Sequence, residues 1–80
     1  MSRYRQRQAL GHPVRVAILV LYKEDTERSL AVDALLDDLR RRTYLAEQHP
    51  SVFRNLDAAK VKYHRARLQD VDLLPVQGQQ

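Results

Sequence analysis

The chain has 80 residues, a net charge of +4 and no cysteine. A chain of this length forms one small domain that buries only about 60–65% of its unfolded surface, so we expect a homodimer to add stability. The lack of cysteine excludes a disulfide framework and a thiolate metal site. The apolar run 16–22 is too short to span a bilayer, and the first residues have no signal-type apolar region. We therefore expect a cytoplasmic protein.

The basic residues are concentrated in two stretches. Residues 1–15 contain four arginines and no acidic residue, and residues 57–68 contain four basic residues and one acidic residue. Between them, residues 24–38 carry an excess of acidic side chains. Positive potential that is confined to particular surfaces favours a polyanionic partner.

The N-terminal segment is predicted to be a basic arm or a short helix. Arg3, Arg5 and Arg7 alternate in a strand-like period, whereas the glutamines between them favour a helix. Ser2 could cap such a helix and Gly11 would end it. The alternative is an arm that becomes ordered on a phosphate backbone, or a frayed terminus without a binding role.

A helix is predicted to begin at Pro13, because the missing amide of proline costs nothing at the first helical position. A strand is the competing interpretation, since the run after this proline is rich in β-branched residues. The residues that would share the buried face are Val14, Ala17, Ile18 and Leu21. Further apolar surface comes from Val16, Leu19 and Val20. This second surface is predicted to be a homodimer contact or an ordinary part of the core.

The middle of the chain is predicted to hold a second helix. Residues 23–28 form a polar turn, and residues 29–31 are either a very short strand or the start of the helix. The apolar stripe with helical spacing is Val32, Leu35, Leu36 and Leu39. Acidic residues come first in this helix and the arginines at 40–42 come last, which complements the helix dipole. These arginines could also touch phosphates.

Residues 43–56 form a long connection to the third helix. Either the second helix continues through residues 45–46 to a stop near Pro50, or a separate turn spans residues 51–55 with Ser51 as its cap. The apolar residues of this segment that are predicted to pack on the core are Val52, Phe53 and Leu56.

The stretch 57–71 is predicted to be an amphipathic helix. The Asp57 carboxylate can accept hydrogen bonds from the free amides of the first turn, which makes it the predicted N-cap. At about 100° per residue, the buried side consists of Val61, His64, Leu68 and Val71. Asp72 falls where such a helix ends in a left-handed residue, and Pro75 prevents its continuation. The residues then predicted to form a short strand are Leu73, Leu74 and Val76.

Two sequence patterns in the chain resemble a known family. The pattern V-K-Y-H-x-x-x-L-x-x-x-x-L-L-P-V, at residues 61–76, resembles the recognition helix and first wing strand of ArsR-like winged helix-turn-helix proteins. A second pattern, H-P-V-R-x-x-I-L at residues 12–19, is similar to the opening helix of the same family. The chain departs from the family at Arg65, where leucine is usual, and at Asp72, where glycine is usual. Its connection 43–56 is also longer than the family's short turn, and the tail at 77–80 is too short to complete a wing.

The resemblance implies a sequence-specific duplex DNA-binding transcriptional regulator. The implied fold is mainly α: a winged-helix-like helix-turn-helix three-helix core with a minimal or truncated β wing. Residues 12–76 would form this domain, between a basic N-terminal arm or short helix at 1–11 and a tail at 77–80. The recognition helix, at about 57–71, would enter the major groove of double-stranded DNA, and the protein would act as a homodimer.

The predicted site residues come from the exposed side of the recognition helix and from the N-terminal segment. Those expected to enter the groove are Ala59, Lys62, Tyr63, Ala66 and Arg67. The cations expected to neutralise phosphates are Lys60, Arg65, Arg3, Arg5 and Arg7. Lysine or arginine in the groove can contact guanine. The alternative is a protein-interaction module on the same scaffold, such as an adaptor or antitoxin, working through the acidic second helix or the apolar surplus of the first.

Catalysis and metal binding are not predicted. His12, His49 and His64 are dispersed in the sequence, without the spacing of metal ligands. His64 lies beside the apolar stripe and is predicted to be a half-buried packing residue. The two glycines form no phosphate-binding loop, and no nucleophile has a neighbouring base. We therefore expect no enzyme, no cofactor and no metal.

Overall fold

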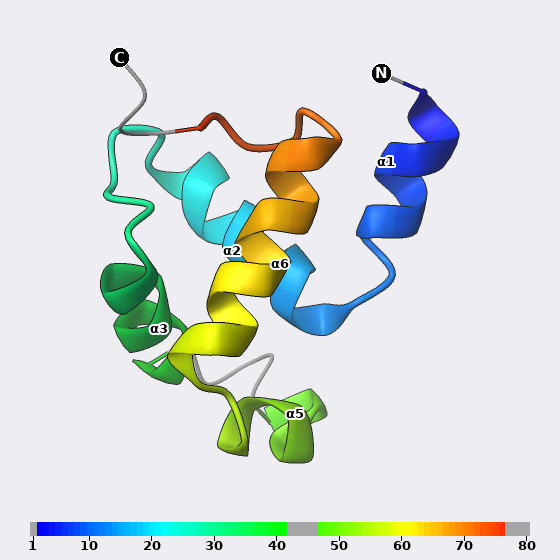
Figure 1. Ribbon diagram of the computed structural model, residues 1–80. Helices are drawn as coiled ribbons and strands as arrows, with labels where there is room; N and C mark the ends of the chain where they lie inside the picture. Colours follow the sequence, from blue (N-terminus) through cyan, green and yellow to red (C-terminus); the bar gives the residue numbers. More distant parts are fainter. Residues whose placement is uncertain (1, 42–46, 77–80) are drawn as a thin grey trace.

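The computed structural model describes residues 2–41 and 47–76, and within these two segments it is mainly helical and contains no strand. The helices are α1 (Arg3–Ala9), α2 (Pro13–Glu24), α3 (Val32–Arg41), α5 (Pro50–Arg54) and α6 (Ala58–Asp70). Figure 1 shows α6 crossing α2, with α3 on one side, α1 on the other, and α5 below the N-terminal end of α6. The mainly α class expected from the sequence is confirmed. In the same segments, no helix has both the length and the hydropathy that crossing a bilayer requires.

α6 is the central helix of the fold. It contacts α1, α2 and α3, and it buries Val61, His64 and Leu68 against them. The hydrophobic core consists of Val14, Ala17, Ile18, Leu21, Leu30, Leu35, Leu39, Phe53, Leu56, Val61, Leu68 and Leu74. Because the neighbouring helices cover one side of α6, its opposite side faces solvent.

Both ends of α6 are fixed by local hydrogen bonds, as the sequence predicted. The Asp57 carboxylate accepts a hydrogen bond of 2.9 Å from a first-turn amide, which confirms it as the N-cap. At the other end, Asp72 has a φ of 62°, which is the left-handed conformation expected there. The amide of Asp72 donates to the carbonyl of Gln69, and the amide of Leu73 donates to the carbonyl of Leu68. This pair of bonds is a Schellman motif, which satisfies two carbonyls that the helix end leaves free.

The short strand predicted after α6 is wrong for the described residues. The amide of Leu73 bonds back to the helix and Leu74 is buried, so the chain folds over the helix end and does not run extended beside a partner. Residues 29–31, which the sequence left open between a very short strand and the start of the second helix, form neither, because α3 begins at Val32 and residues 29–31 lead into it with Leu30 buried in the core. The turn expected at residues 77–80 lies outside the described residues.

α2 begins as the sequence predicted. Pro13 is its first residue, and Nδ1 of His12 accepts a hydrogen bond of 3.2 Å from the amide of Val14. The face predicted to be buried is buried, namely Val14, Ala17, Ile18 and Leu21. The second apolar surface stays partly open, since the side chain of Val20 is 46% exposed. The helix continues through Glu24, so the polar turn after it is shorter than predicted.

α3 covers another side of α6. Leu35 and Leu39 are fully buried, as their helical spacing predicted. The exposed ion pair between Arg41 and Asp37 spans one turn at 2.9 Å, so this part of the arginine cluster is engaged within its own helix. The third arginine of the cluster, Arg42, lies outside the described residues.

α5 occupies the long connection before α6. It begins at Pro50, so Ser51 lies inside the first turn and the prediction that it caps the turn is wrong. Proline is favoured at the first helical position because it has no amide to satisfy. The apolar residues of this segment pack as predicted, with Phe53 and Leu56 buried and Val52 half-buried. The other alternative, a second helix that continues through residues 45–46, lies outside the described residues.

α1 is a helix, which was one of the alternatives that the sequence left open. The Ser2 hydroxyl caps it by accepting a hydrogen bond of 3.2 Å from the amide of Tyr4. The side-chain amide of Gln6 donates to the carbonyl of Val71 at 2.9 Å. Ala9 is buried. These contacts dock α1 beside the C-terminal end of α6.

Candidate nucleic-acid interface

The side of α6 that faces away from the core is exposed along the helix. Its exposed residues include Ala59, Lys60, Lys62, Tyr63, Ala66 and Arg67. Tyr63 projects from the middle of this face and is 57% exposed. Ala59 and Ala66 lie one turn before and one turn after Tyr63. Because their side chains are small, the tyrosine ring projects beyond its neighbours on the helix. At about 100° per residue, Lys62 lies on one flank of the tyrosine and Arg67 on the other. We name this surface the outward face of α6.

One acidic residue on the outward face was missed by sequence reasoning. Asp70 is exposed and lies one further turn along from Ala66. Its helical position alone could have shown that it shares the side of Tyr63. The positive part of the outward face is therefore confined to its first three turns.

Arg65 departs from its predicted role as a phosphate contact. Its Nη1 donates a hydrogen bond of 2.9 Å to the carbonyl of Leu30, and its side chain is partly buried. The physical reason is that position 65 lies on the flank of α6 nearest the irregular segment before α3, whose backbone offers an acceptor. Arg65 therefore connects two elements of the fold and does not belong to the outward face.

Lys60 lies at the edge of the outward face and is tied to α5. Its ammonium donates a hydrogen bond of 2.8 Å to the carbonyl of Asn55, at the end of α5. The lysine is exposed, so its charge is still accessible to an anion. The structure thus places this predicted residue between the outward face and the connection that precedes α6.

The three N-terminal arginines are exposed, but they do not share one side of α1. Arg3 and Arg7 are one turn apart and lie on the same side, whereas Arg5 points about 160–200° away from them. The arginines alternate in the sequence, and in the helix this spacing places Arg5 on a different side of α1 from Arg3 and Arg7. Because α1 docks beside α6, Arg3 and Arg7 form a cationic pair that is separate from the outward face.

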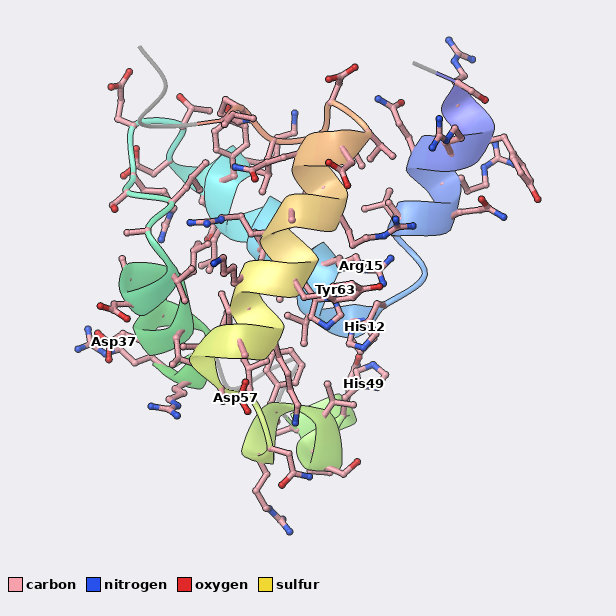
Figure 2. The ribbon with its side chains drawn as sticks, in the orientation of Figure 1. His12, Arg15, Asp37, His49, Asp57 and Tyr63 are labelled. Atoms are coloured by element: carbon pink, nitrogen blue, oxygen red, sulfur yellow. The ribbon has the colours of Figure 1, made fainter. Side chains whose placement is uncertain are left out.

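Sequence reasoning also missed a cluster beside Tyr63, at the contact between α2 and α6. Nε of Arg15 donates a hydrogen bond of 3.1 Å to Nδ1 of His64, and Nη1 of Arg15 donates to the carbonyl of Ala9 at 3.1 Å. The guanidinium carbon lies 5.9 Å from the centre of the Tyr63 ring. The ring centres of His12 and His64 are 4.1 Å apart with the planes tilted by 32°. Figure 2 shows Arg15, Tyr63 and His12 close together on one side of α6.

The pKa values of both imidazoles in this cluster are lowered, which favours their neutral forms. The pKa of His64 is lowered from 6.5 to about 4, first by burial and then by electrostatic interaction with His12 and Arg15. The pKa of His12 is also lowered, by burial first and then by Arg15 and His49. His64 is only 8% exposed, so it is more deeply buried than the half-buried residue that the sequence predicted. Little in the sequence indicated that the rings of His12 and His64 would be in contact, because the two histidines are far apart along the chain.

The described residues bring no three His, Asp or Glu side chains together as metal ligands. Comparison with models of known protein families, with curated proteins and with solved structures gives no match to this chain. What the chain does must therefore be inferred from its own geometry.

Proposed function

We propose that the chain is a winged-helix-like, ArsR-like helix-turn-helix regulator that binds duplex DNA through the outward face of α6. The observation that carries the proposal is the division of this helix: one side is buried under α1, α2 and α3, and the other presents Lys62, Tyr63 and Arg67 to solvent. A helix of 13 residues is about 20 Å long. The major groove, about 12 Å wide, admits such a helix.

The side chains of the outward face have distinct roles in this proposal. Lys62 and Arg67 contact guanine edges or phosphates, and Tyr63 supplies an aromatic surface beside them. The small side chains of Ala59 and Ala66 allow the helix to approach the base edges closely. Asp70 is exposed and would repel phosphates, so the groove contacts of α6 itself would come from its first three turns.

Other cations would contact the phosphate backbone. Lys60 is exposed at the edge of the outward face, where its ammonium could reach a phosphate. Arg3 and Arg7 on α1 would take over phosphate contacts that a wing makes in a complete winged helix. Such contacts give affinity that falls steeply with salt concentration, without reading sequence.

The proposal includes a homodimer formed through α2. An open apolar groove of about 400 Å³ runs along its second surface. The groove is lined by Leu10, Val16, Leu19, Val20, Lys23 and Glu24. A two-fold contact matches the groove with itself, so that the apolar residues of one subunit would cover those of the other. A dimer would read two half-sites about one helical turn of DNA apart. A regulator of this kind would act in the cytoplasm.

The same groove favours a second candidate function. An exposed apolar strip that is bordered by charged residues is a common feature of protein-binding surfaces. In that case the chain would be an adaptor or antitoxin-like module, and the basic residues of α6 would serve only as a solvated surface. Duplex binding would then be weak and independent of sequence.

The deciding experiment is fluorescence anisotropy of the purified chain with a labelled random duplex pool, at several salt concentrations. Bound duplexes are recovered, sequenced and tested again singly. Enrichment of a palindrome, with binding that weakens steeply as salt rises, would support the dimeric regulator. Equal and weak binding to all duplexes would reject it in favour of the interaction module.

A further inference from the structure

A pocket of about 340 Å³ lies where α5, the first turn of α2 and the N-terminal half of α6 meet. Its lining residues are His12, Val14, Ser51, Val52, Asn55, Leu56, Lys60 and His64. Figure 2 shows His12 directly above α5, with His49 between them. The volume is within the range of small-molecule sites, about 300–1,000 Å³. The connection that separates this chain from the ArsR-like outline thus forms one wall of a cavity.

The two histidines of the pocket can act only as donors toward a ligand. Nδ1 of His12 accepts from the amide of Val14, and Nδ1 of His64 accepts from Arg15. A neutral imidazole that accepts at Nδ1 carries its proton on Nε2. Each ring therefore has one free group, an Nε2–H, and this group donates.

The remaining polar residues of the pocket add more donors. Lys60 uses one of its three N–H groups on the Asn55 carbonyl, so two are left for a ligand. The side-chain amide of Asn55 uses one N–H on the carbonyl of Ser51 and keeps the other. No carboxylate is among the lining residues. Asp57, the N-cap of α6, is not a lining residue, and its carboxylate accepts from the amide of Lys60. The side-chain oxygen of Asn55 and the hydroxyl of Ser51 can also accept hydrogen bonds, but the one full charge among the lining residues is the positive charge of Lys60.

The other side of the pocket is apolar. The apolar lining residues are Val14, Val52 and Leu56. Val14 and Leu56 are almost completely buried in the core, so the accessible apolar surface belongs mainly to half-buried Val52 on α5. A bare inorganic anion would leave the Val52 side chain in contact with water. A ligand with a short hydrocarbon body would cover the surface and contribute about 25 cal/mol for each Å² removed from water.

We infer that this pocket binds a small organic anion, a carboxylate on a short aliphatic body, with the carboxylate at Lys60 and the imidazole N–H groups and the body against Val14, Val52 and Leu56. The inference goes beyond the proposed function, because it concerns the free protein and does not require that the chain bind DNA. The anion would also compensate the positive charges that Lys60 and Arg15 place at this end of α6.

The test is a titration of the ¹⁵N-labelled chain with hexanoate, followed by ¹H–¹⁵N correlation spectra. We expect saturable shifts at the backbone amides of Val14, Ser51, Asn55 and His64. Two further probes separate charge from body: hexanamide keeps the body without the charge, and inorganic phosphate keeps negative charge without the body. Each should bind at least tenfold more weakly than hexanoate.

Two variants on α5 locate the site. Ser51→Trp fills the pocket and should weaken hexanoate binding at least tenfold, whereas Arg54→Trp, on the same helix but outside the lining, should leave it unchanged. Circular dichroism confirms that each variant is folded, and the comparison of hexanoate with hexanamide in the unaltered chain does not depend on any variant. Absent or unsaturable shifts, equal binding of the three probes, or equal loss in both variants would overturn the inference.

Discussion

Nε of Arg15 donates a hydrogen bond of 3.1 Å to Nδ1 of His64, so a nearly buried imidazole accepts from a guanidinium. An imidazolium has no lone pair with which to accept, so the bond exists only while His64 is neutral. Protonation would also place a new positive charge next to the guanidinium of Arg15. The contact between α2 and α6 therefore depends on the charge state of one side chain.

We expect the domain to lose stability as the pH falls below 6.5. The pKa of His64 is about 4 in the folded chain, and in the unfolded chain we take it to have the ordinary value of 6.5. Between these two pH values the unfolded chain binds a proton at His64 that the folded chain does not. The contribution of His64 to the free energy of unfolding is complete above the pKa of the unfolded chain. It is lost as the pH falls toward the lower pKa of the folded chain. Between pH 7.5 and pH 5 the free energy of unfolding should fall by about 1–2 kcal/mol. Urea unfolding at the two pH values measures this change.

The control for this pH dependence is His64→Gln, which keeps a polar acceptor and does not titrate. The variant should lose most of the difference between the two pH values. Equal stability of the unaltered chain at both pH values would contradict the prediction.

Arg15→Met should raise the pKa of His64. The substitution removes one of the positive charges that lower this pKa, but burial, the largest cause, remains. The new pKa should therefore lie above 4 and still below the ordinary value of 6.5. NMR titration of the His64 ring protons gives the value directly. Arg5→Met, on the exposed side of α1, is the matched control. An unchanged pKa in Arg15→Met would show that the guanidinium has no electrostatic effect on the imidazole.

Reversal of charge at Lys62 and Arg67 together should abolish specific duplex binding and leave the fold intact. Both side chains are exposed, so their replacement by glutamate leaves the core unchanged. Loss of two base or phosphate contacts, each worth about 1–3 kcal/mol, predicts a loss of affinity of about a hundredfold or more. Anisotropy titration measures the affinity and circular dichroism the fold. Arg54→Glu on α5, outside both the outward face and the α2 groove, controls for reversal of a positive charge elsewhere on the surface. A double variant that binds as tightly as the unaltered chain would reject α6 as the DNA-binding helix.

Asp72→Gly should stabilise the domain by about 0.5–1 kcal/mol. Asp72 has a φ of 62°, a left-handed conformation in which the β-carbon clashes with the backbone, and glycine has no β-carbon. Asp72→Ala should be less stable than the glycine variant by about 1 kcal/mol. Thermal unfolding of the two variants provides the comparison. An alanine variant as stable as the glycine variant would show that the left-handed end of α6 is not formed in solution.

Val20→Glu should prevent dimer formation and leave each subunit folded. The side chain is 46% exposed on the open apolar groove of α2, so a charge is tolerated in the monomer and would be buried unpaired in the proposed dimer. Sedimentation equilibrium measures the mass. Arg54→Glu, on α5, should dimerise normally. A dimer that persists in Val20→Glu would exclude this groove as the contact.

The features that the sequence predicted correctly depend on neighbours along the chain. The capping carboxylate of Asp57, the left-handed Asp72 and the start of α2 at Pro13 are set by contacts within a few residues. Helical periodicity also identified the buried faces of α2, α3 and α6, since hydrophobic burial follows the 3.6-residue repeat.

The features that the sequence missed depend on contacts between distant segments. Arg65 and Leu30 are brought together only by the packing of α6 beside the segment before α3, and no spacing rule predicts that bond. The contact of Arg15 with His64 likewise requires that α2 and α6 be packed together. The expected strand at 73–76 failed because the Schellman turn folds the chain over the helix end. Periodicity correctly predicted which basic, aromatic and small residues are exposed on the outward face of α6, but it was not used to place Asp70 there. On α1, the sequence did not predict that Arg5 would lie on a different side from Arg3 and Arg7.

The shallow docking of α1 has a consequence for local unfolding. Within the described part of the chain, this helix is held by buried Ala9, whose carbonyl accepts from Arg15, by half-buried Leu10 at its end, and by the bond from Gln6 to Val71. Detaching α1 exposes little apolar surface, so its opening should require less free energy than unfolding of the whole domain. Arg3 and Arg7 therefore belong to a unit that can open while α6 remains fully protected from hydrogen exchange. The same loose attachment would let a polyanion change the dynamics of this chain by closing α1 onto the core, without altering any bond inside it.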